Sequence, residues 1–241
     1  SGIGIFIYMI AAYPEYRIHK DDMQFNKENI TNIFSLSGFT CLQQSVMNFG
    51  ILCVQGIVNS FGTVIMAAFA VAVKIDTIAY MPVQDFGNAF SVFVAQNYGA
   101  GQRQRIKKGI KQSVVSVIIF CMCISAVVCG FADTFMGIFV DNSSVEVINA
   151  GAVYLRMEGT FYIGIGILFM LYGYYRAINK PMMSVVLTVI SLGTRVVLAY
   201  TLSGISAIGV IGIWVAIPIG WFLADAAGII YYIFKAGKSH I

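Results

Sequence analysis

The long uncharged stretches of this chain most constrain what it can fold into. No charged residue occurs between Glu28 and Lys74, or between Lys111 and Asp133. A helix crosses the hydrocarbon core of a bilayer with about 20 apolar residues. Only 11% of the residues are charged, against about 25% in soluble domains. The sequence therefore predicts an all-α, polytopic helical membrane protein and excludes a soluble globular one.

Turn residues and charges divide the chain into six complete transmembrane helices that follow the end of an earlier one. Residues 1–13 are predicted to be the end of a truncated membrane helix, 14–30 a cytoplasmic linker, 31–234 a six-helix lobe and 235–241 a cytoplasmic tail. The six helices are predicted at 31–58, 63–97, 112–132, 152–176, 181–202 and 207–234. The segment 133–151 is predicted to be a loop.

Basic residues assign the two sides of the membrane. Twelve of the fifteen Lys and Arg residues lie in four alternating segments, 14–30, 99–112, 176–180 and 235–241. The positive-inside rule places these segments in the cytoplasm. We therefore expect a multi-pass protein of the cell membrane with a cytoplasmic C-terminus. This distribution explains the positive net charge without a nucleic-acid partner.

Seven ionisable residues fall inside the predicted spans, where each charge costs about 2.5–3.5 kcal/mol at the bilayer centre. Three are basic and four are acidic, so three ion pairs would leave one acid without a basic partner. Such an acid can bind a proton or a cation. We expect Glu158 or Asp76 to be this ion-coupling group, with Arg195 near Glu158. The alternative is that all are structural ion pairs. That role is expected for the remaining candidates, which are Lys74, Arg156, Arg195 and Asp225.

The first complete helix carries an unusual number of neutral polar side chains. Gln44, Asn48 and Gln55 recur at spacings of four and seven, which places them on one face, and Gln43 lies beside them. Tyr162 lies deep in a later span, where its ring could attract an organic cation. We expect these five residues to line a polar cavity. The alternatives are hydrogen bonds between packed helices for the four polar residues and an interfacial aromatic belt for the tyrosine.

Motifs of the common enzyme classes are missing from the sequence. It contains no G-x-x-x-x-G-K-[ST] phosphate loop, no H-E-x-x-H and no G-x-S-x-G. None of the five cysteines has a nearby histidine, which disfavours a metal site. We therefore expect a protein that is not an enzyme and has no metal or other cofactor.

Four segments resemble helices of the multidrug and toxic compound extrusion (MATE) family. The segments 42–63 (LQQSVMNFGILCVQGIVNSFGT) and 70–102 (AVAVKIDTIAYMPVQDFGNAFSVFVAQNYGAGQ) are similar to the seventh and eighth helices. The segment 154–181 (YLRMEGTFYIGIGILFMLYGYYRAINKP) resembles the tenth, and 211–228 (IGIWVAIPIGWFLADAAG) the twelfth. The element from Gln96 to Gln102, followed by a basic stretch, is the most specific part.

The resemblance implies a twelve-helix antiporter in two six-helix lobes, of which this chain would be the C-terminal one. Such a protein would take in H⁺ or Na⁺ and export organic cations, with the N-terminal lobe of the same polypeptide as its partner in the bilayer. Some family members carry a cation-binding carboxylate on the seventh helix, but 31–58 has none. Glu158 lies on the tenth helix, where the family can hold a coupling carboxylate.

Two other functions stay open at this point. One is a flippase for lipid-linked oligosaccharides from the same superfamily, although the slightly acidic balance within the spans favours cationic cargo. The other is a membrane scaffold that transports nothing, whose polar helix faces only dock partner helices.

Overall fold

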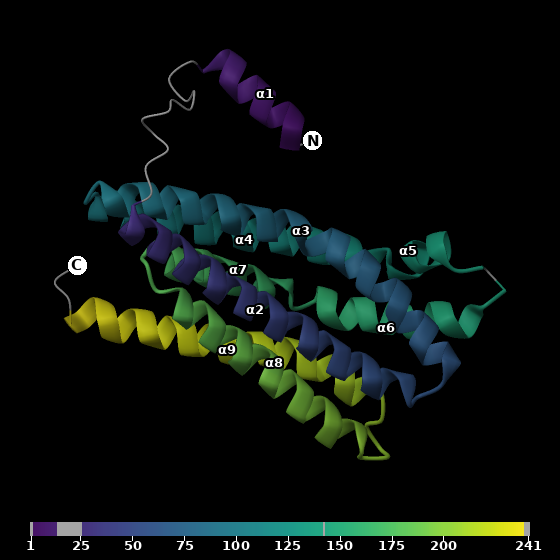
Figure 1. The fold of residues 1–241 in the computed structure, drawn as a ribbon. Coiled ribbons are helices and arrows are strands. Elements are labelled where there is room, and N and C mark those ends of the chain that lie inside the picture. Colours follow the sequence, from purple (N-terminus) through teal and green to yellow (C-terminus); the bar gives the residue numbers. More distant parts are fainter. Residues whose placement is uncertain (1, 14–25, 142, 239–241) are drawn as a thin grey trace. The chain divides into compact units, whose positions relative to one another are not determined.

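The computed structural model describes residues 2–13, 26–141 and 143–238, and the regular structure in these ranges is entirely helical (Figure 1). This confirms the predicted fold class. The helices are α1 (Gly2–Ala12), α2 (Lys27–Asn59), α3 (Thr63–Gly99), α4 (Arg103–Gly130), α5 (Ala132–Phe139), α6 (Val145–Gly159), α7 (Tyr162–Ala177), α8 (Pro181–Ser203) and α9 (Ile211–Lys238).

The helices group into two compact units that divide between Ser37 and Gly38. The first unit holds α1 and the beginning of α2, and the second holds the rest of α2 together with α3 to α9. Most of the predicted linker 14–30 lies outside the described residues. The predicted domain boundaries 1–13, 31–234 and 235–241 stay predictions.

Within the described residues, five helices are long and apolar enough to cross a membrane, and α6 and α7 count as a sixth span when the pair is taken as one. That sixth span is bent by 55°. The prediction of one continuous helix over 152–176 was therefore wrong, because the chain breaks between Gly159 and Tyr162. At the break, the Phe161 amide donates to the Glu158 carbonyl three residues back, and the Thr160 hydroxyl donates to the Arg156 carbonyl at 2.6 Å. The Thr160 amide still donates to the Arg156 carbonyl at 3.2 Å, so the regular helical ladder ends at Thr160 and the Phe161 bond forms a turn.

Two further boundaries differ from the sequence prediction. α4 begins at Arg103, so the basic stretch that was expected to be a loop up to residue 112 forms the first turns of the helix. α5 occupies part of the segment 133–151, which was also predicted to be a loop. Ala132 and Met136 of α5 are buried, which fixes one face of this short helix to the bundle. Ile106 and Gly109 in the first turns of α4 are buried as well, so tertiary packing stabilises both helical segments, and the charge pattern of the sequence does not indicate that packing.

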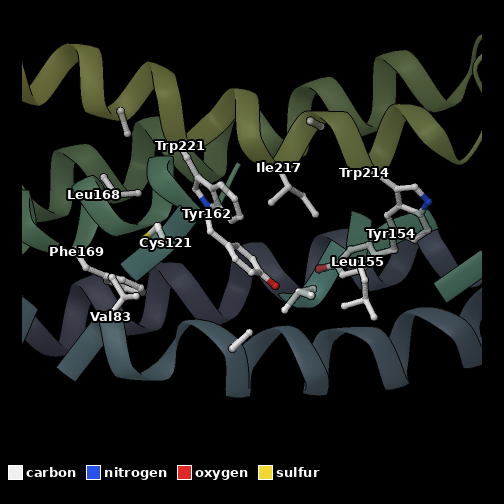
Figure 2. Close-up of a cluster of buried hydrophobic side chains, with 14 of the residues drawn as sticks. Val83, Cys121, Tyr154, Leu155, Tyr162, Leu168, Phe169, Trp214, Ile217 and Trp221 are labelled. Atoms are coloured by element: carbon white, nitrogen blue, oxygen red, sulfur yellow. The ribbon is translucent and has the colours of Figure 1, made fainter. Parts of the chain in front are cut away.

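α3 is the helix around which the second unit packs, against α4, α6 and α7, while α8 and α9 form a closely packed pair (Figure 1). An aromatic cluster joins α3, α6 and α9. The rings of Phe69 and Trp214 stack with centroids 5.4 Å apart, and Tyr154 meets Trp214 edge-on at 5.0 Å. Figure 2 shows Tyr154 and Trp214 side by side in this cluster. The cluster holds α6 at a fixed position just before the break in the sixth span.

Candidate functional site

Two buried carboxyl groups meet inside the bundle. Asp76 on α3 is 4% exposed and Glu158 at the end of α6 is 1% exposed. Their carboxyl groups interact with each other. The hydroxyl of Tyr162, the first residue of α7, donates to Oδ1 of Asp76 at 2.5 Å. The structure thus brings together both predicted ion-coupling residues and one of the predicted cavity residues.

The break between α6 and α7 produces this arrangement. Glu158 ends one helical segment and Tyr162 begins the next, so the turn directs both side chains toward α3. Figure 2 shows Tyr162 inside the bundle with its hydroxyl end directed toward Tyr154. Tyr154 lies four residues before Glu158, on the same face of α6, and its side chain interacts with the Glu158 carboxyl group. Glu158 Oε1 has no hydrogen-bond partner among the described residues.

Arg195 on α8 brings a positive charge to the same place. It interacts electrostatically with both Asp76 and Glu158, and its guanidinium carbon lies 5.9 Å from the ring centroid of Trp221. Among the described residues it forms no direct ion pair, and its Nε is buried without a hydrogen-bond partner. Arg195 therefore offsets one of the two negative charges without forming an ion pair with either carboxyl group.

The carboxyl pair borders a cavity of about 280 Å³ whose wall comes from α2, α3, α6, α7, α8 and α9. The wall combines aliphatic, aromatic and neutral polar side chains with the two acids and Arg195. The aromatic residues are Phe69, Tyr80, Tyr154, Phe169, Tyr172 and Trp221, and the polar ones are Gln44, Thr77, Gln84, Thr188 and Ser191. This is a space in which a molecule with an apolar body and a positive charge finds both π faces and carboxyl groups.

The predicted cavity residues divide into three groups. Gln44 lines this cavity, and Gln43 and Gln44 both line a smaller adjoining one. Tyr162 lies behind the wall and reaches the site through Asp76. Asn48 is exposed, Gln55 donates to the Asn59 side chain at 3.0 Å, and neither lines these two cavities.

Among the ion-pair candidates, Arg156 has a partner that the sequence did not indicate. It pairs with Asp133, in the first turn of α5, and the two side chains are 47% and 54% exposed. Lys74 is exposed, and the described part of the chain shows no ion pair to it. The expected pairing of acids and bases within the spans is therefore not the arrangement seen for either residue.

Because the Arg156–Asp133 pair is half exposed, we expect it to contribute little to stability. Exposed pairs contribute about 0.2–1 kcal/mol. Replacing Arg156 with glutamine should therefore lower the free energy of unfolding by less than about 1 kcal/mol. Thermal unfolding of the purified protein in detergent checks this, with Asp133→Asn as the matched variant. A loss above about 2 kcal/mol would show that the pair is a structural lock.

Asp225 on α9 is buried without a partner. It is 4% exposed, and neither of its carboxyl oxygens has a hydrogen-bond partner among the described residues. This does not match the expected ion pair for Asp225. A buried polar group that makes no hydrogen bond costs stability of about 1–3 kcal/mol.

We therefore expect Asp225→Leu to raise the thermal unfolding temperature. Leucine removes the unsatisfied oxygens at similar volume, which recovers up to about 1–3 kcal/mol. Asp76→Leu is the matched control, because Asp76 is equally buried but accepts a hydrogen bond from Tyr162. Its unfolding temperature should fall. A fall for Asp225→Leu as well would mean that Asp225 has a stabilising partner.

Several residues of the site were missed at the level of sequence. Tyr154 and Tyr80 could have been found, since each lies four residues from one of the acids and so shares its helix face. Trp221, Thr188 and Ser191 carry no such signal, because their helices meet the acids only through tertiary packing. No group of three or more metal-ligating side chains is present in the described ranges.

Comparison with known proteins identifies several relatives. The chain is 26% identical over 200 residues to the probable multidrug resistance protein YpnP of Bacillus subtilis, covering 82% of this chain and 44% of that protein. It is 20% identical over 215 residues to the probable multidrug resistance protein NorM of Thermotoga maritima, covering 89% and 46%. An FAD transporter of Shewanella oneidensis is 26% identical over 156 residues, covering 64% and 33%. The chain spans less than half the length of these relatives.

Solved structures share the fold over nearly the whole chain. An outward-facing MATE transporter of the MOP superfamily matches with a TM-score of 0.89 at 18% identity, covering 97% of this chain and 53% of that structure. A MOP superfamily transporter from Pyrococcus furiosus matches with a TM-score of 0.88 at 18% identity, covering 98% and 54%. The model of the MatE family matches residues 40–201, more than half of the chain. This multi-pass membrane protein therefore belongs to the MATE family.

Proposed function

We propose that this chain is the C-terminal lobe of an antiporter that takes in H⁺ or Na⁺ and exports organic cations. The observation that carries the proposal is the buried Asp76–Glu158 pair at the wall of an aromatic cavity. Family membership supports transport as the activity, and two relatives are described as probable multidrug resistance proteins. The lobe would act with an N-terminal lobe in the cell membrane, without a cofactor.

The charges around the cavity suggest how exchange works. Two acids and one arginine line it, so a single negative charge is unbalanced when both acids are ionised. One proton, one sodium ion or one monovalent organic cation neutralises that charge. Ions and substrate therefore compete for the same carboxyl pair, and competition for one charge is sufficient to couple their movements.

The Tyr162 hydroxyl and Arg195 set how the pair holds this charge. The hydrogen bond from Tyr162 stabilises a negative charge on Asp76. Two buried carboxylates that interact with each other cannot both stay ionised at low cost. Glu158 is therefore the group that binds the proton, or that binds the sodium ion together with Asp76. The aromatic side chains of the wall then bind the apolar body of the substrate cation, and its positive charge interacts with the two carboxyl groups.

The proposal is tested with the full-length protein in liposomes. A cationic dye is enclosed, and a proton gradient and a sodium gradient are imposed in separate experiments. Dye movement that follows one gradient and stops when that gradient is collapsed would establish antiport and identify the ion. No movement under either gradient would contradict the proposal and favour lipid flipping, which is assayed with a labelled lipid-linked oligosaccharide.

The cytoplasmic position of the C-terminus belongs to the same proposal. It rests on the basic residues at the beginning of α4 and at the C-terminal ends of α7 and α9. Accessibility of an introduced C-terminal cysteine to an impermeant thiol reagent, in intact cells and in inverted vesicles, distinguishes the two orientations. Labelling in intact cells would place the C-terminus outside the cell and contradict the proposed orientation.

A further inference from the structure

A second cavity of about 60 Å³ adjoins the larger one and shares part of its wall. Five residues line both spaces, so the two cavities lie side by side: Gln44, Met47, Gln84, Phe169 and Tyr172. Thr40, Gln43, Asn88 and Arg176 complete the smaller wall. We call this space the Arg176 pocket. Its volume accommodates a small polar group, not a ring system.

Hydrogen bonds orient the guanidinium of Arg176 within this pocket. Its Nε donates to the Tyr172 carbonyl at 3.3 Å, and a terminal nitrogen donates to Oδ1 of Asn88 at 3.0 Å. A guanidinium has five N–H donors, so these two bonds leave donors for a ligand. Because Asn88 accepts through its oxygen, its amide nitrogen is also a donor.

The wall of the Arg176 pocket is suited to an oxyanion. Arg176 is the one charged residue among the nine that line it, and none of the nine is acidic. Gln43, Gln44 and Gln84 add amide groups that donate hydrogen bonds. A structural role that only ties α7 to α3 would need the bond to Asn88, but it would not need three further amide side chains in the wall of the same pocket.

The Arg176 pocket lies far from the carboxyl pair along the same cavity system. Asp76 and Asn88 are twelve residues apart on α3, which corresponds to about 18 Å at 1.5 Å per residue. Aromatic residues of the shared wall, Phe169 and Tyr172, lie between the two ends. The two adjoining cavities taken together therefore have an acidic end, an aromatic middle and a basic end.

We propose that the Arg176 pocket is an anion subsite that binds a carboxylate or phosphate group on an elongated substrate. The apolar body of that substrate lies along the aromatic wall and its positive end meets Asp76 and Glu158. The proposal rests on the function proposed above for the acidic end. It narrows the substrate class to amphoteric molecules long enough to reach both ends.

Binding to the purified full-length protein tests the subsite without requiring transport. The probes are a cationic rhodamine ester carrying an alkyl tether that ends in a carboxylate, and the same compound with that carboxylate methylated. Fluorescence polarisation measures both dissociation constants. We expect the carboxylate probe to bind about tenfold more tightly, as expected for one added charge-assisted hydrogen-bonding contact.

Three variants assign any difference to Arg176. Arg176→Gln should bring the ratio of the two dissociation constants close to one. Gln84→Glu, which places a negative charge in the pocket at nearly constant shape, should do the same and covers the case in which Arg176→Gln does not fold. Gln55→Glu is the matched control, since Gln55 lines neither cavity, and it should keep the tenfold ratio.

The outcomes separate this proposal from the function proposed for the carboxyl pair. A tenfold ratio that disappears in Arg176→Gln and Gln84→Glu supports the subsite even if neither probe crosses a liposome membrane under a gradient. Equal binding of both probes to the unaltered protein overturns it, and so does a ratio that both variants retain. Displacement of the carboxylate probe by phosphatidylglycerol, without displacement of its methyl ester, would assign the pocket to a lipid headgroup and overturn the substrate subsite.

Discussion

Replacing Glu158 with glutamine should abolish gradient-driven export by the full-length protein while the protein remains folded. Glutamine has nearly the same shape but binds neither a proton nor a cation by charge. A charge-assisted contact contributes about 1.5–3 kcal/mol, so cation affinity should fall roughly ten- to a hundredfold. Dye export from liposomes under the coupling gradient, together with dye binding in detergent, measures both effects. Asp76→Asn should show the same loss of coupling.

The matched control for this experiment is Glu146→Gln. Glu146 lies in the first turn of the same helix, α6, but it is exposed and lies outside the cavity. Its replacement should leave export unchanged. Full coupling in both Glu158→Gln and Asp76→Asn would contradict a coupling role for the pair and leave the structural role as the explanation.

Replacing Gly173 with alanine should destabilise the protein and reduce export. Gly173 of α7 lies directly against Gly87 of α3. A β-carbon at Gly173 would lie 2.5 Å from the Gly87 carbonyl oxygen. That atom belongs to the backbone of a packed helix, so the helices must separate. Overpacking of this kind costs about 1–3 kcal/mol, and Phe169 and Tyr172 of the cavity wall move with α7. Thermal unfolding and dye binding measure the two consequences.

Gly193 on α8 is the matched control for Gly173. A β-carbon at Gly193 meets no atom within 4 Å, and alanine favours a helix over glycine by about 1 kcal/mol. Gly193→Ala should therefore be neutral or stabilising by up to about 1 kcal/mol. Equal behaviour of Gly173→Ala and Gly193→Ala would show that the contact between α3 and α7 relaxes without cost.

The break between α6 and α7 could not be predicted from the sequence. The segment 152–176 predicted one helix because its apolar residues on both sides of Arg156 and Glu158 together have the length of one span, and no proline marks a break. Apolar periodicity reports how a segment partitions into a membrane, but it does not report a local change of hydrogen-bond partner. At the 55° bend, the Phe161 amide donates to the Glu158 carbonyl and the Thr160 hydroxyl donates to the Arg156 carbonyl. These hydrogen bonds form in the packed bundle, and the hydropathy of the segment alone does not predict them.

The acids were identified from the sequence because a charge within a membrane span is costly wherever it lies. Composition and depth were sufficient to select Asp76 and Glu158. They were not sufficient to assign partners: Arg156 pairs with Asp133 outside the expected set, and Asp225 has none among the described residues. The free-energy cost of burying a charge depends on one residue and can be predicted from the sequence. The ion-pair partner depends on how two helices pack, and the sequence alone does not give that.

The sequence by itself determined the all-helical membrane fold, six apolar segments and the two acids that stand out within them. These follow from the free energy of transferring each segment into a bilayer, which depends on local composition. Only the tertiary structure decided that Tyr162 donates to Asp76, that Arg195 lies over the Trp221 ring beside the pair, and that Arg176 lines an adjoining cavity. Those relations depend on how α3, α7, α8 and α9 pack, and packing is set by close contacts between residues far apart in the chain.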